Sequence, residues 1–424
     1  MPDVPFPVGR SAQVLPFLAR HGIVPVVPSI RSSDYELALA DPFVYYLVRR
    51  LGLSSLLWYS EALSHGSWYH VAAEHDDFTL SDQELLAWVR EENLPPGFRA
   101  TYELRRAELG RACDELGISG DTRRELADRL LKDTRTGLAF YAGSAQVVIP
   151  GEFKQTWRSF LMQPQWRILA REFPIAWDDS VCRLDLLLFQ EDSRALWIVD
   201  FKTTSLPPSL RLSTCVLEFQ SQHYLHGLRQ NLPSLIFKFG LPPDTVVGGI
   251  MHIAIQKPQI RLSREDRDFE LVDVTPTRGP NKGVTRQEKR YFGEPRVHNF
   301  LSRVVDWYTS QGLYLHTAPE TAAEPRVNIG FTPISSVLDE HGLFQYSKRL
   351  EVIQELRLRE PAPENFPTNP SSLRGKGKEP SPFLLFATRP VDEWPDIMNK
   401  KGIVVRHRDL EPENGEEEGQ EEDH

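Results

Sequence analysis

Residues 182–204 read CRLDLLLFQEDSRALWIVDFKTT, and the predicted fold follows from this stretch. Two apolar runs, 182–189 and 196–203, flank the polar segment QEDSRA. A third run, at 169–177, precedes them across the polar segment DDS. Short apolar runs separated by polar turns are typical of an antiparallel meander. We therefore predict three consecutive antiparallel strands here.

The second hairpin of this meander brings three ionisable side chains together. We take Phe189 and Leu196 as the pair next to the turn. Antiparallel pairing then places Asp185 directly opposite Asp200, with Cβ atoms about 4.5–5.5 Å apart on one face. Lys202 projects from the same face, because side chains alternate along a strand with a period of two.

Two opposed carboxylates beside an ammonium group are typical of a metal site. In apolar surroundings they repel each other unless a cation or a proton lies between them. Mg²⁺ or Mn²⁺, which prefer oxygen ligands, would relieve that repulsion, polarise a phosphate and lower the pKa of a bound water. Lys202 would position or deprotonate the water and stabilise negative charge. A structural alternative stays open, in which both Asp residues end strands and Lys202 forms an ordinary surface ion pair.

The run RLDLLLF…LWIVDFKTTS resembles the core of the PD-(D/E)XK nuclease superfamily, specifically its RecB-like branch, which includes phage-type exonucleases. The resemblance implies an α/β (mixed α+β) fold. Its restriction-endonuclease-like core has a central mixed sheet flanked by helices, and extra helices and a less defined C-terminal region are added to it. Members of the family cut DNA with Mg²⁺ or Mn²⁺. The resemblance makes Asp185, Asp200 and Lys202 catalytic, and it adds both Asp side chains and the backbone carbonyl of Phe201 as metal ligands.

The stretch GSWYHVAAE at 66–74 resembles the GxxxHxxxE helix of the same branch. Gly66, His70 and Glu74 are spaced by four and therefore share one helical face. In the family this histidine reaches the metal, so the resemblance makes His70 the third side-chain ligand. It places Gly66 and Glu74 beside the site or the DNA. A lone helical histidine is otherwise more often an ordinary surface or core residue.

Gln220 and Tyr224, in EFQSQHYLHGL, match the QxxxY helix of the branch. There the glutamine supports the active site or contacts the DNA. The same i, i+4 spacing also serves simple packing on a helix.

Residues 29–53 resemble the opening segment of the branch, a Ser-rich turn before a helix. Some members begin that helix with Cys-Pro and bind an iron–sulfur cluster through this and three later cysteines. Here Asp41 precedes the proline and no cysteine follows Cys215, so we expect no iron–sulfur cluster.

Glu172 lies on the predicted strand before Asp185 and is a further carboxylate candidate for the metal. Our register across the DDS turn does not place it beside Asp185. We therefore rank it below the other candidates.

The net charge of −10 argues against a nucleic-acid partner until it is divided along the chain. Residues 411–424 contain eight acids, which leaves −2 for the rest. The stretch 274–303 carries seven Lys or Arg against two Glu, a net +5, and we interpret it as a loop that grips phosphates. An ordinary solvated segment is an equal alternative. The lower-ranked DNA contacts in this stretch are Arg278, Lys282, Arg286, Lys289 and Arg290.

The chain divides into a core and several appended segments. The predicted division is an N-terminal extension at 1–24, a nuclease core at 25–260, a C-terminal extension at 261–360, a Pro/Gly-rich linker or loop at 361–382, a short segment at 383–410 and a disordered acidic tail at 411–424. Apolar spacing predicts helices over 34–51, 82–92 and 152–171. Ser81 and Glu84 form a capping box before the second of these.

Three scattered cysteines and a first segment without a secretory pattern favour a reducing cytoplasm, in a cell or in the host of a phage or mobile element. No stretch is apolar enough to predict a membrane span. DNA is the expected partner, with a helicase, a recombinase or a single-strand annealing protein as candidate protein partners. The leading interpretation is a Mg²⁺- or Mn²⁺-dependent deoxyribonuclease, an exonuclease rather than an endonuclease. A catalytically inactive DNA-binding or scaffold protein and a restriction-type endonuclease remain the alternatives.

Overall fold

The computed structural model describes most of the 424 residues. The described residues are 11–55, 61–90, 94–149, 154–258, 260, 263–275, 278, 284–293, 296–309, 325–360, 366, 383, 385–386, 389 and 391–405.

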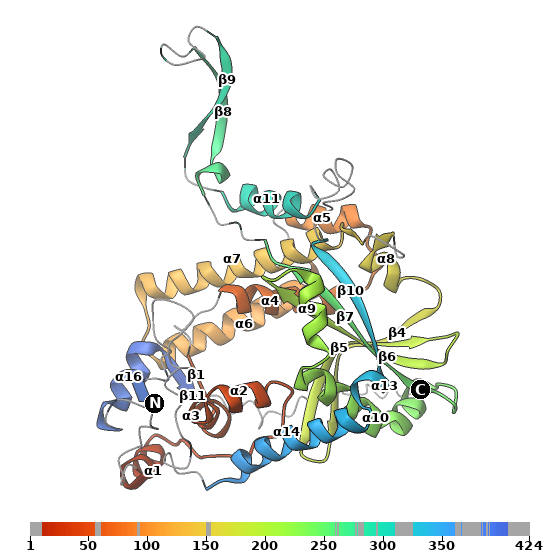
Figure 1. Cartoon of the computed structure of the whole chain (residues 1–424). Coiled ribbons are helices and arrows are strands. Elements are labelled where there is room, and N and C mark those ends of the chain that lie inside the picture. Colours follow the sequence, from red (N-terminus) through yellow and green to blue (C-terminus); the bar gives the residue numbers. More distant parts are fainter. Residues whose placement is uncertain are drawn as a thin grey trace, which may run out of the picture.

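A five-stranded sheet forms the centre of the molecule (Figure 1). In spatial order its strands are β10 (Val327–Pro333), β7 (Val246–Gln256), β6 (Ala195–Thr204), β5 (Ser180–Gln190) and β4 (Trp166–Trp177). β6 and β7 run parallel, and every other neighbouring pair is antiparallel. The sheet is therefore mixed, and the predicted α/β class and the predicted meander are both confirmed.

Helices cover both faces of the sheet, because its strands are apolar on both sides. Along β6, Leu196 and Ile198 pack on one face, whereas Val199 and Phe201 pack on the other. The first face carries α10 (Phe219–Phe239), α13 (Ile334–Val337) and α14 (Glu340–Leu358), and α9 (Pro208–Cys215) precedes α10. The second face carries α4 (Glu61–His75), α5 (Asp82–Arg90), α6 (Pro96–Glu115), α7 (Gly120–Ser144), α8 (Trp157–Leu161) and α11 (Val297–Thr309).

The register of the hairpin β5–β6 is the predicted one, but its ladder is shorter. Phe189 pairs with Leu196, and the pairing ends at Leu186 and Val199. The prediction that Asp185 lies paired opposite Asp200 is therefore wrong, because the two strands separate one pair earlier.

The register of β4–β5 differs from our prediction because the turn between the two strands is one residue shorter. Trp177 pairs with Ser180, so the turn consists of two residues rather than three. Arg171 consequently pairs with Leu186, and this register places Glu172 opposite Asp185. Placing Glu172 away from Asp185 was thus wrong, since a slip of one residue changes every facing pair.

The N-terminal helical predictions hold in part. The stretch 34–51 contains α2 (Asp34–Ala40), α3 (Pro42–Tyr45) and the π-helix η1 (Tyr46–Arg50), with the predicted break at Pro42. The capping box before α5 is present, since Ser81 and Glu84 bond to each other's backbone N–H. The helix predicted at 152–171 is wrong. That stretch contains the short strand β3 (Gln155–Thr156), the five-residue helix α8 and the start of β4.

The two ends of the described chain share a separate hydrophobic cluster. It joins α1 (Ser11–Arg20) to α16 (Trp394–Lys401), which the 3₁₀ turn η4 (Val391–Glu393) precedes. β1 (Leu53–Ser55) pairs beside it with β11 (Ile403–Val405). Described parts of the predicted segments 1–24 and 383–410 therefore pack together. The tail at 411–424 and, apart from Phe366, the linker at 361–382 lie outside the described residues.

A two-stranded hairpin projects from the body beside α11 (Figure 1). It consists of β8 (Asp268–Val274) and β9 (Arg286–Phe292), and we call residues 268–292 the β8–β9 arm. The prediction of a basic loop over 274–303 is therefore wrong in shape, since its described part is largely strand and helix. The 3₁₀ turn η2 (Arg264–Asp266) precedes the arm, and the strand β2 (Val148–Ile149) pairs with β3 elsewhere.

Within the described part of the chain, no helix combines the length and the apolar character that crossing a membrane requires.

A buried ion pair fixes the end of α4, the helix that carries His70. Asp76 follows α4 directly, is fully buried and accepts two hydrogen bonds from Arg158 of α8, at 2.6 and 2.9 Å. The hydroxyl of Tyr141 on α7 donates a third, at 2.5 Å. One carboxylate thus ties three helices together.

Asp76→Asn should lower the free energy of unfolding by about 3–5 kcal/mol, because it leaves the buried Arg158 guanidinium without its counter-charge. Asp77→Asn is the matched control, since Asp77 is exposed and, within the described residues, accepts hydrogen bonds only from nearby Thr79. The control should cost no more than about 1 kcal/mol. Urea unfolding measures both, and equal losses would contradict the proposed anchoring.

Candidate metal centre

The candidate site lies where β5 and β6 separate. Beyond the last ladder pair, the backbone N–H of Phe201 donates to Oδ2 of Asp185 at 2.7 Å. The carboxylate thus replaces the carbonyl that a continued ladder would have supplied. Its other oxygen, Oδ1, stays available to groups from neighbouring elements.

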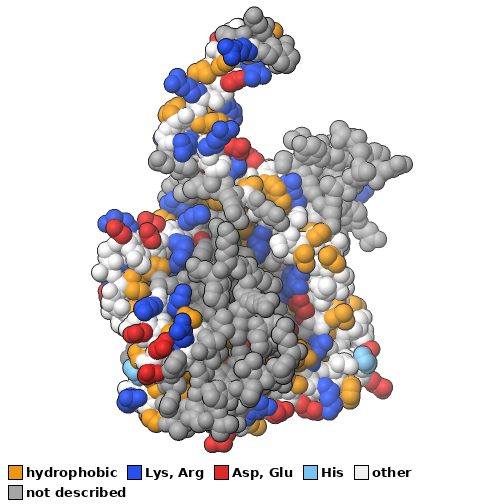
Figure 2. All heavy atoms as spheres, turned by 60° about the vertical axis from the view of Figure 1, so that its left-hand side comes forward, with side chains coloured by type: hydrophobic (Ala, Val, Ile, Leu, Met, Phe, Trp, Pro, Cys, Tyr) orange, Lys and Arg blue, Asp and Glu red, His pale blue; other side chains and the backbone are white. Residues whose placement is uncertain are grey.

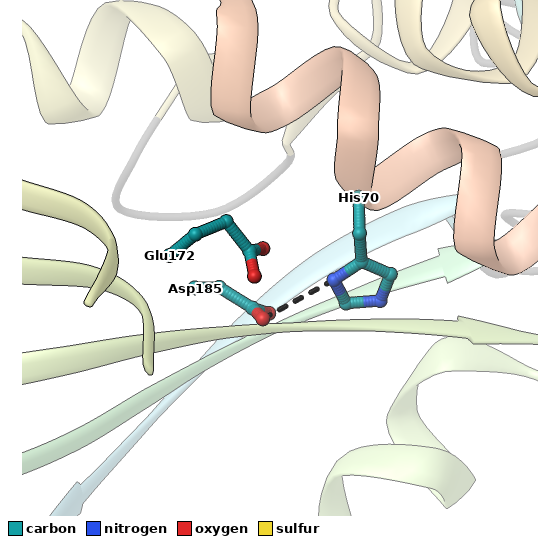
Figure 3. A group of neighbouring side chains, drawn as sticks. All are labelled: His70, Glu172 and Asp185. Atoms are coloured by element: carbon teal, nitrogen blue, oxygen red, sulfur yellow. Dashed lines mark ion pairs between the residues drawn. The ribbon is translucent and has the colours of Figure 1, made fainter. Parts of the chain in front are cut away.

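Three side chains from three elements converge beside this opening (Figure 3). His70 of α4 places Nδ1 3.2 Å from Oδ1 of Asp185. Glu172 of β4 completes the group, and one ligand atom from each residue lies within 4.8 Å of the other two. Two carboxylate oxygens and an imidazole nitrogen at this spacing fit a divalent cation that accepts oxygen ligands, such as Mg²⁺ or Mn²⁺.

The α4 helix can approach the sheet because Gly66 carries no side chain. A Cβ at Gly66 would come within 2.8 Å of Oγ1 of Thr203 on β6. His70 lies one turn further along the helix and so reaches the gap between β5 and β6. The GxxxHxxxE spacing thus has a packing reason at its glycine.

The pKa shifts of the cluster reflect the repulsion between its two carboxylates and their attraction to His70. Burial and the Asp185 carboxylate raise the pKa of Glu172 to about 7. Burial alone would lower the pKa of His70, but the Asp185 charge outweighs it and raises that pKa to about 9. His70 in turn outweighs the burial of Asp185 and lowers its pKa. In this state a proton on His70 supplies the compensating charge, and a metal ion would replace it.

Glu172 itself has a left-handed backbone conformation, with φ of 43°. Such a φ is uncommon for residues other than glycine and costs about 1–3 kcal/mol. Strain of this kind concentrates at functional sites, which supports a role for the Glu172 carboxylate rather than a purely structural one.

Asp200 and Lys202 form a second group on β6, close enough to the cluster for Asp185 to raise the pKa of Lys202 and for Asp200 to raise that of His70. Lys202 Nζ is 2.9 Å from Oδ2 of the buried Asp200, and it also donates to Oε1 of Gln220. Gln220 Nε2 donates onward to the Tyr224 hydroxyl at 2.6 Å. Burial would lower the pKa of Lys202, but Asp200 outweighs it and raises that pKa, so the amine stays protonated.

His252 is a neighbour of Asp200 that the sequence analysis did not single out. It pairs with Asp200 across the parallel strands β6 and β7, and its Nε2 is 3.6 Å from Oδ2. Ser221 Oγ donates to the Cys215 carbonyl at 2.7 Å and lies 3.1 Å from Nε2, so Nε2 is the donor to Oγ. The available signal was a histidine inside the apolar run VVGGIMHIAIQ at 246–256.

The structure thus brings most of the predicted site residues together, but the three that best fit a metal ion are not the three that we had predicted. His70 and Asp185 meet, as do Asp200, Lys202, Gln220 and Tyr224. The group nearest to a metal-binding arrangement contains Glu172, which we had ranked low, in place of Asp200. Glu74 contributes to raising the pKa of Glu172 and is therefore close to the cluster. The described basic candidates of the arm are Arg278, Arg286, Lys289 and Arg290, whereas Lys282 lies outside the described residues.

Removing a cluster carboxylate should weaken metal binding. We expect Glu172→Gln and Asp185→Asn each to lower the affinity for Mn²⁺ at least about tenfold, in calorimetric titrations without DNA. Glu191→Gln is the matched control, because Glu191 lies in the β5–β6 turn and pairs with Arg167 on the surface. If Glu172→Gln binds Mn²⁺ as tightly as the control does, Glu172 is not a ligand.

Metal binding should depend on pH in a defined direction. A divalent ion must displace the His70 proton, whose pKa is about 9, and below about pH 7 also the Glu172 proton. The affinity for Mn²⁺ should therefore rise as the pH increases from 6 to 9, with protons released on binding. Titration calorimetry in two buffers of different ionisation enthalpy counts those protons. An affinity that is constant over this range would contradict the assignment.

Comparison with known protein families identifies the superfamily to which the core of this chain is similar. Residues 32–260, more than half of the chain, match the PD-(D/E)XK nuclease superfamily. No curated protein matches the chain significantly. The matched segment contains His70, Glu172, Asp185, Asp200 and Lys202 together with four of the five strands of the central sheet, and it ends before the β8–β9 arm. The chain belongs to the PD-(D/E)XK nuclease superfamily.

Proposed function

We propose that the protein is a Mg²⁺- or Mn²⁺-dependent deoxyribonuclease of the RecB-like exonuclease type, acting in DNA recombination, repair or phage DNA processing. The convergence of His70 and Asp185 at the opening between β5 and β6, with Asp200 and Lys202 next to it on β6, carries this proposal. The GxxxHxxxE and QxxxY spacings favour the RecB-like type. Cytoplasmic action and a helicase, recombinase or annealing partner remain predictions.

His70, Glu172 and Asp185 would hold the metal, and Asp200 and the Phe201 carbonyl would complete its ligands. The bound metal would polarise the scissile phosphate and activate a water. Lys202, held as an ammonium by Asp200 and Gln220, would stabilise the negative charge that develops on the phosphate. Tyr224 keeps the Gln220 amide oriented toward Lys202, which makes Gln220 and Tyr224 positioning residues.

The geometry favours charge stabilisation by Lys202 over proton abstraction. Its Nζ donates to a carboxylate and an amide oxygen at once, and the Asp200 charge raises its pKa, so it stays an ammonium group without a lone pair to accept a proton. In the absence of a free amine, the proton of the attacking water would leave to solvent or to a carboxylate.

Lys202→Ala should lower kcat for DNA cleavage by about 10²–10³-fold, the usual cost of removing one group that stabilises the transition state. The assay uses linear duplex, closed circular and single-stranded DNA with Mg²⁺ or Mn²⁺. Lys348→Ala is the matched control, since Lys348 pairs with Glu351 on the surface of α14.

The outcomes of this assay separate the candidate functions. Metal-dependent degradation of linear DNA whose kcat falls by that factor in Lys202→Ala supports the proposal. Cleavage of closed circles by the wild type would contradict an exonuclease and favour a restriction-type endonuclease. Binding without cleavage of any substrate would contradict a nuclease and favour the inactive scaffold.

A further inference from the structure

The β8–β9 arm is an addition to the family core. The family match ends at residue 260, and the arm begins at 268. It leaves the body as a two-stranded ribbon and extends away from the helices that cover the sheet (Figure 1). With seven residues in each strand, at about 3.4 Å per residue, each strand is about 24 Å long.

The base of the arm is fixed to α11 by one buried carboxylate. Asp266 is fully buried and accepts two hydrogen bonds from Arg303 of α11, at 2.7 and 2.9 Å. Its backbone carbonyl accepts from Asn299 Nδ2 at 2.9 Å and from the N–H of Arg296 at 2.8 Å. The two chain ends of the arm therefore meet at Asp266, which sets where the arm leaves the body.

The ribbon is stabilised by side-chain pairs of its own. On one face Phe269 and Tyr291 lie opposite each other with ring centroids 6.1 Å apart, and Lys289 Nζ is 4.2 Å above the Phe269 ring. On the other face Glu270 pairs directly with Arg290. Such cross-strand pairs offset the marginal stability of an isolated hairpin. The Phe269 and Tyr291 rings thus cover part of each other, whereas Leu271 and Phe292 remain more than half exposed.

Acidic and basic residues are distributed differently along the arm. Residues 268–292 contain five basic and four acidic residues, so the total nearly balances. Three of the acids are paired: Asp268 with Arg296, Glu270 with Arg290 and Glu288 with Arg286. The connection between the strands, residues 275–285, contains Arg278 and Lys282 and no acid. Figure 2 shows Lys and Arg side chains along the projecting arm.

Two basic side chains of the arm are not neutralised by an acid. Within the described part of the chain, neither Arg278 nor Lys289 forms an ion pair, and both are exposed. The connection also contains three threonines, an asparagine and two glycines, whose hydroxyl, amide and backbone N–H groups are donors for phosphate oxygens. This composition complements a polyanion.

We propose that the β8–β9 arm binds the backbone of duplex DNA outside the cleavage site. The inference rests on the proposed DNA substrate. The major groove of B-DNA admits a two-stranded ribbon, and about 24 Å corresponds to about seven base pairs at 3.4 Å each. The arm projects from the body beside α11, away from the sheet that carries the metal centre (Figure 1), so a duplex bound at that centre would reach the arm only where it continues past the cleavage site. The arm would therefore favour long duplexes over short ones.

The first test compares binding of two duplex lengths without cleavage. Residues 268–292 are replaced by a short Gly-Ser linker, which is possible because the chain ends meet at Asp266. Fluorescence anisotropy in EDTA gives Kd for a 30-base-pair and a 10-base-pair duplex. We expect the deletion to raise Kd for the long duplex about tenfold and to change Kd for the short one less than about twofold. Equal effects on both lengths, or none, would overturn the proposal.

Point variants keep the test valid if the deletion does not fold. Arg278→Ala with Lys289→Ala should reduce the salt dependence of log Kd for the long duplex by about two, since each lost phosphate contact removes about 0.9 from the slope. Arg278→Lys with Lys289→Arg is the matched control, because it retains both charges and should keep the wild-type slope. An unchanged slope in the alanine variant would overturn the proposal.

Two further measurements separate this inference from the proposed function. If the wild type cleaves DNA and the deletion alters neither binding nor cleavage of long duplexes, the arm proposal fails while the nuclease function stands. If the wild type binds long duplexes through the arm and cleaves nothing, the arm proposal stands while the nuclease function fails. If the deletion changes only the oligomeric state in light scattering, the arm is a protein interface and the proposal is overturned.

Discussion

The separation of β5 from β6 is the constraint on which the site depends. A buried backbone N–H must find an acceptor, and at Phe201 that acceptor is the Asp185 carboxylate rather than a strand carbonyl. The exchange lets the ladder end without leaving a polar group unpaired. It also orients the carboxylate, because one oxygen is committed to the backbone and the other faces His70. A continuous ladder would have closed the space in which the three cluster side chains meet.

The position of His70 follows from constraints on both sides of it in α4. Before it, Gly66 allows the helix to contact Thr203 at a distance that a Cβ would forbid. After it, Asp76 holds the end of the helix against Arg158 and Tyr141. The ends of this segment are fixed by packing and by a buried ion pair, so the imidazole is placed by the core and not by the carboxylates alone. Preorganisation of this kind gives a metal site its geometry before the metal arrives.

The sequence was sufficient to predict the meander, the register beside the second turn and the closeness of Asp200 to Lys202, because a period of two and one hairpin turn determine all three. It was not sufficient to predict that Glu172 lies opposite Asp185. The polar segment DDS allows a turn of two or three residues, and that single choice decides which residue of β4 faces Asp185. The helix predicted at 152–171 was wrong because apolar residues of a short helix and of the following strand form one uninterrupted pattern. His252 was missed because a buried histidine in an apolar strand looks like core until its neighbour across the sheet is known.

The site draws on both hydrophobic cores of the nuclease fold. The imidazole of His70 belongs to a helix on one face of the sheet, whereas Lys202 contacts Gln220 of α10 on the other. β6 supplies groups to both faces, since Phe201 and Asp200 are successive residues and point in opposite directions. The metal ligands and the ammonium therefore keep their relative positions only while both faces remain packed. Net charge is a poor guide to function in this chain for a separate reason. The acids that contribute to −10 include the few that the chemistry requires, and phosphate binding needs only a local basic surface.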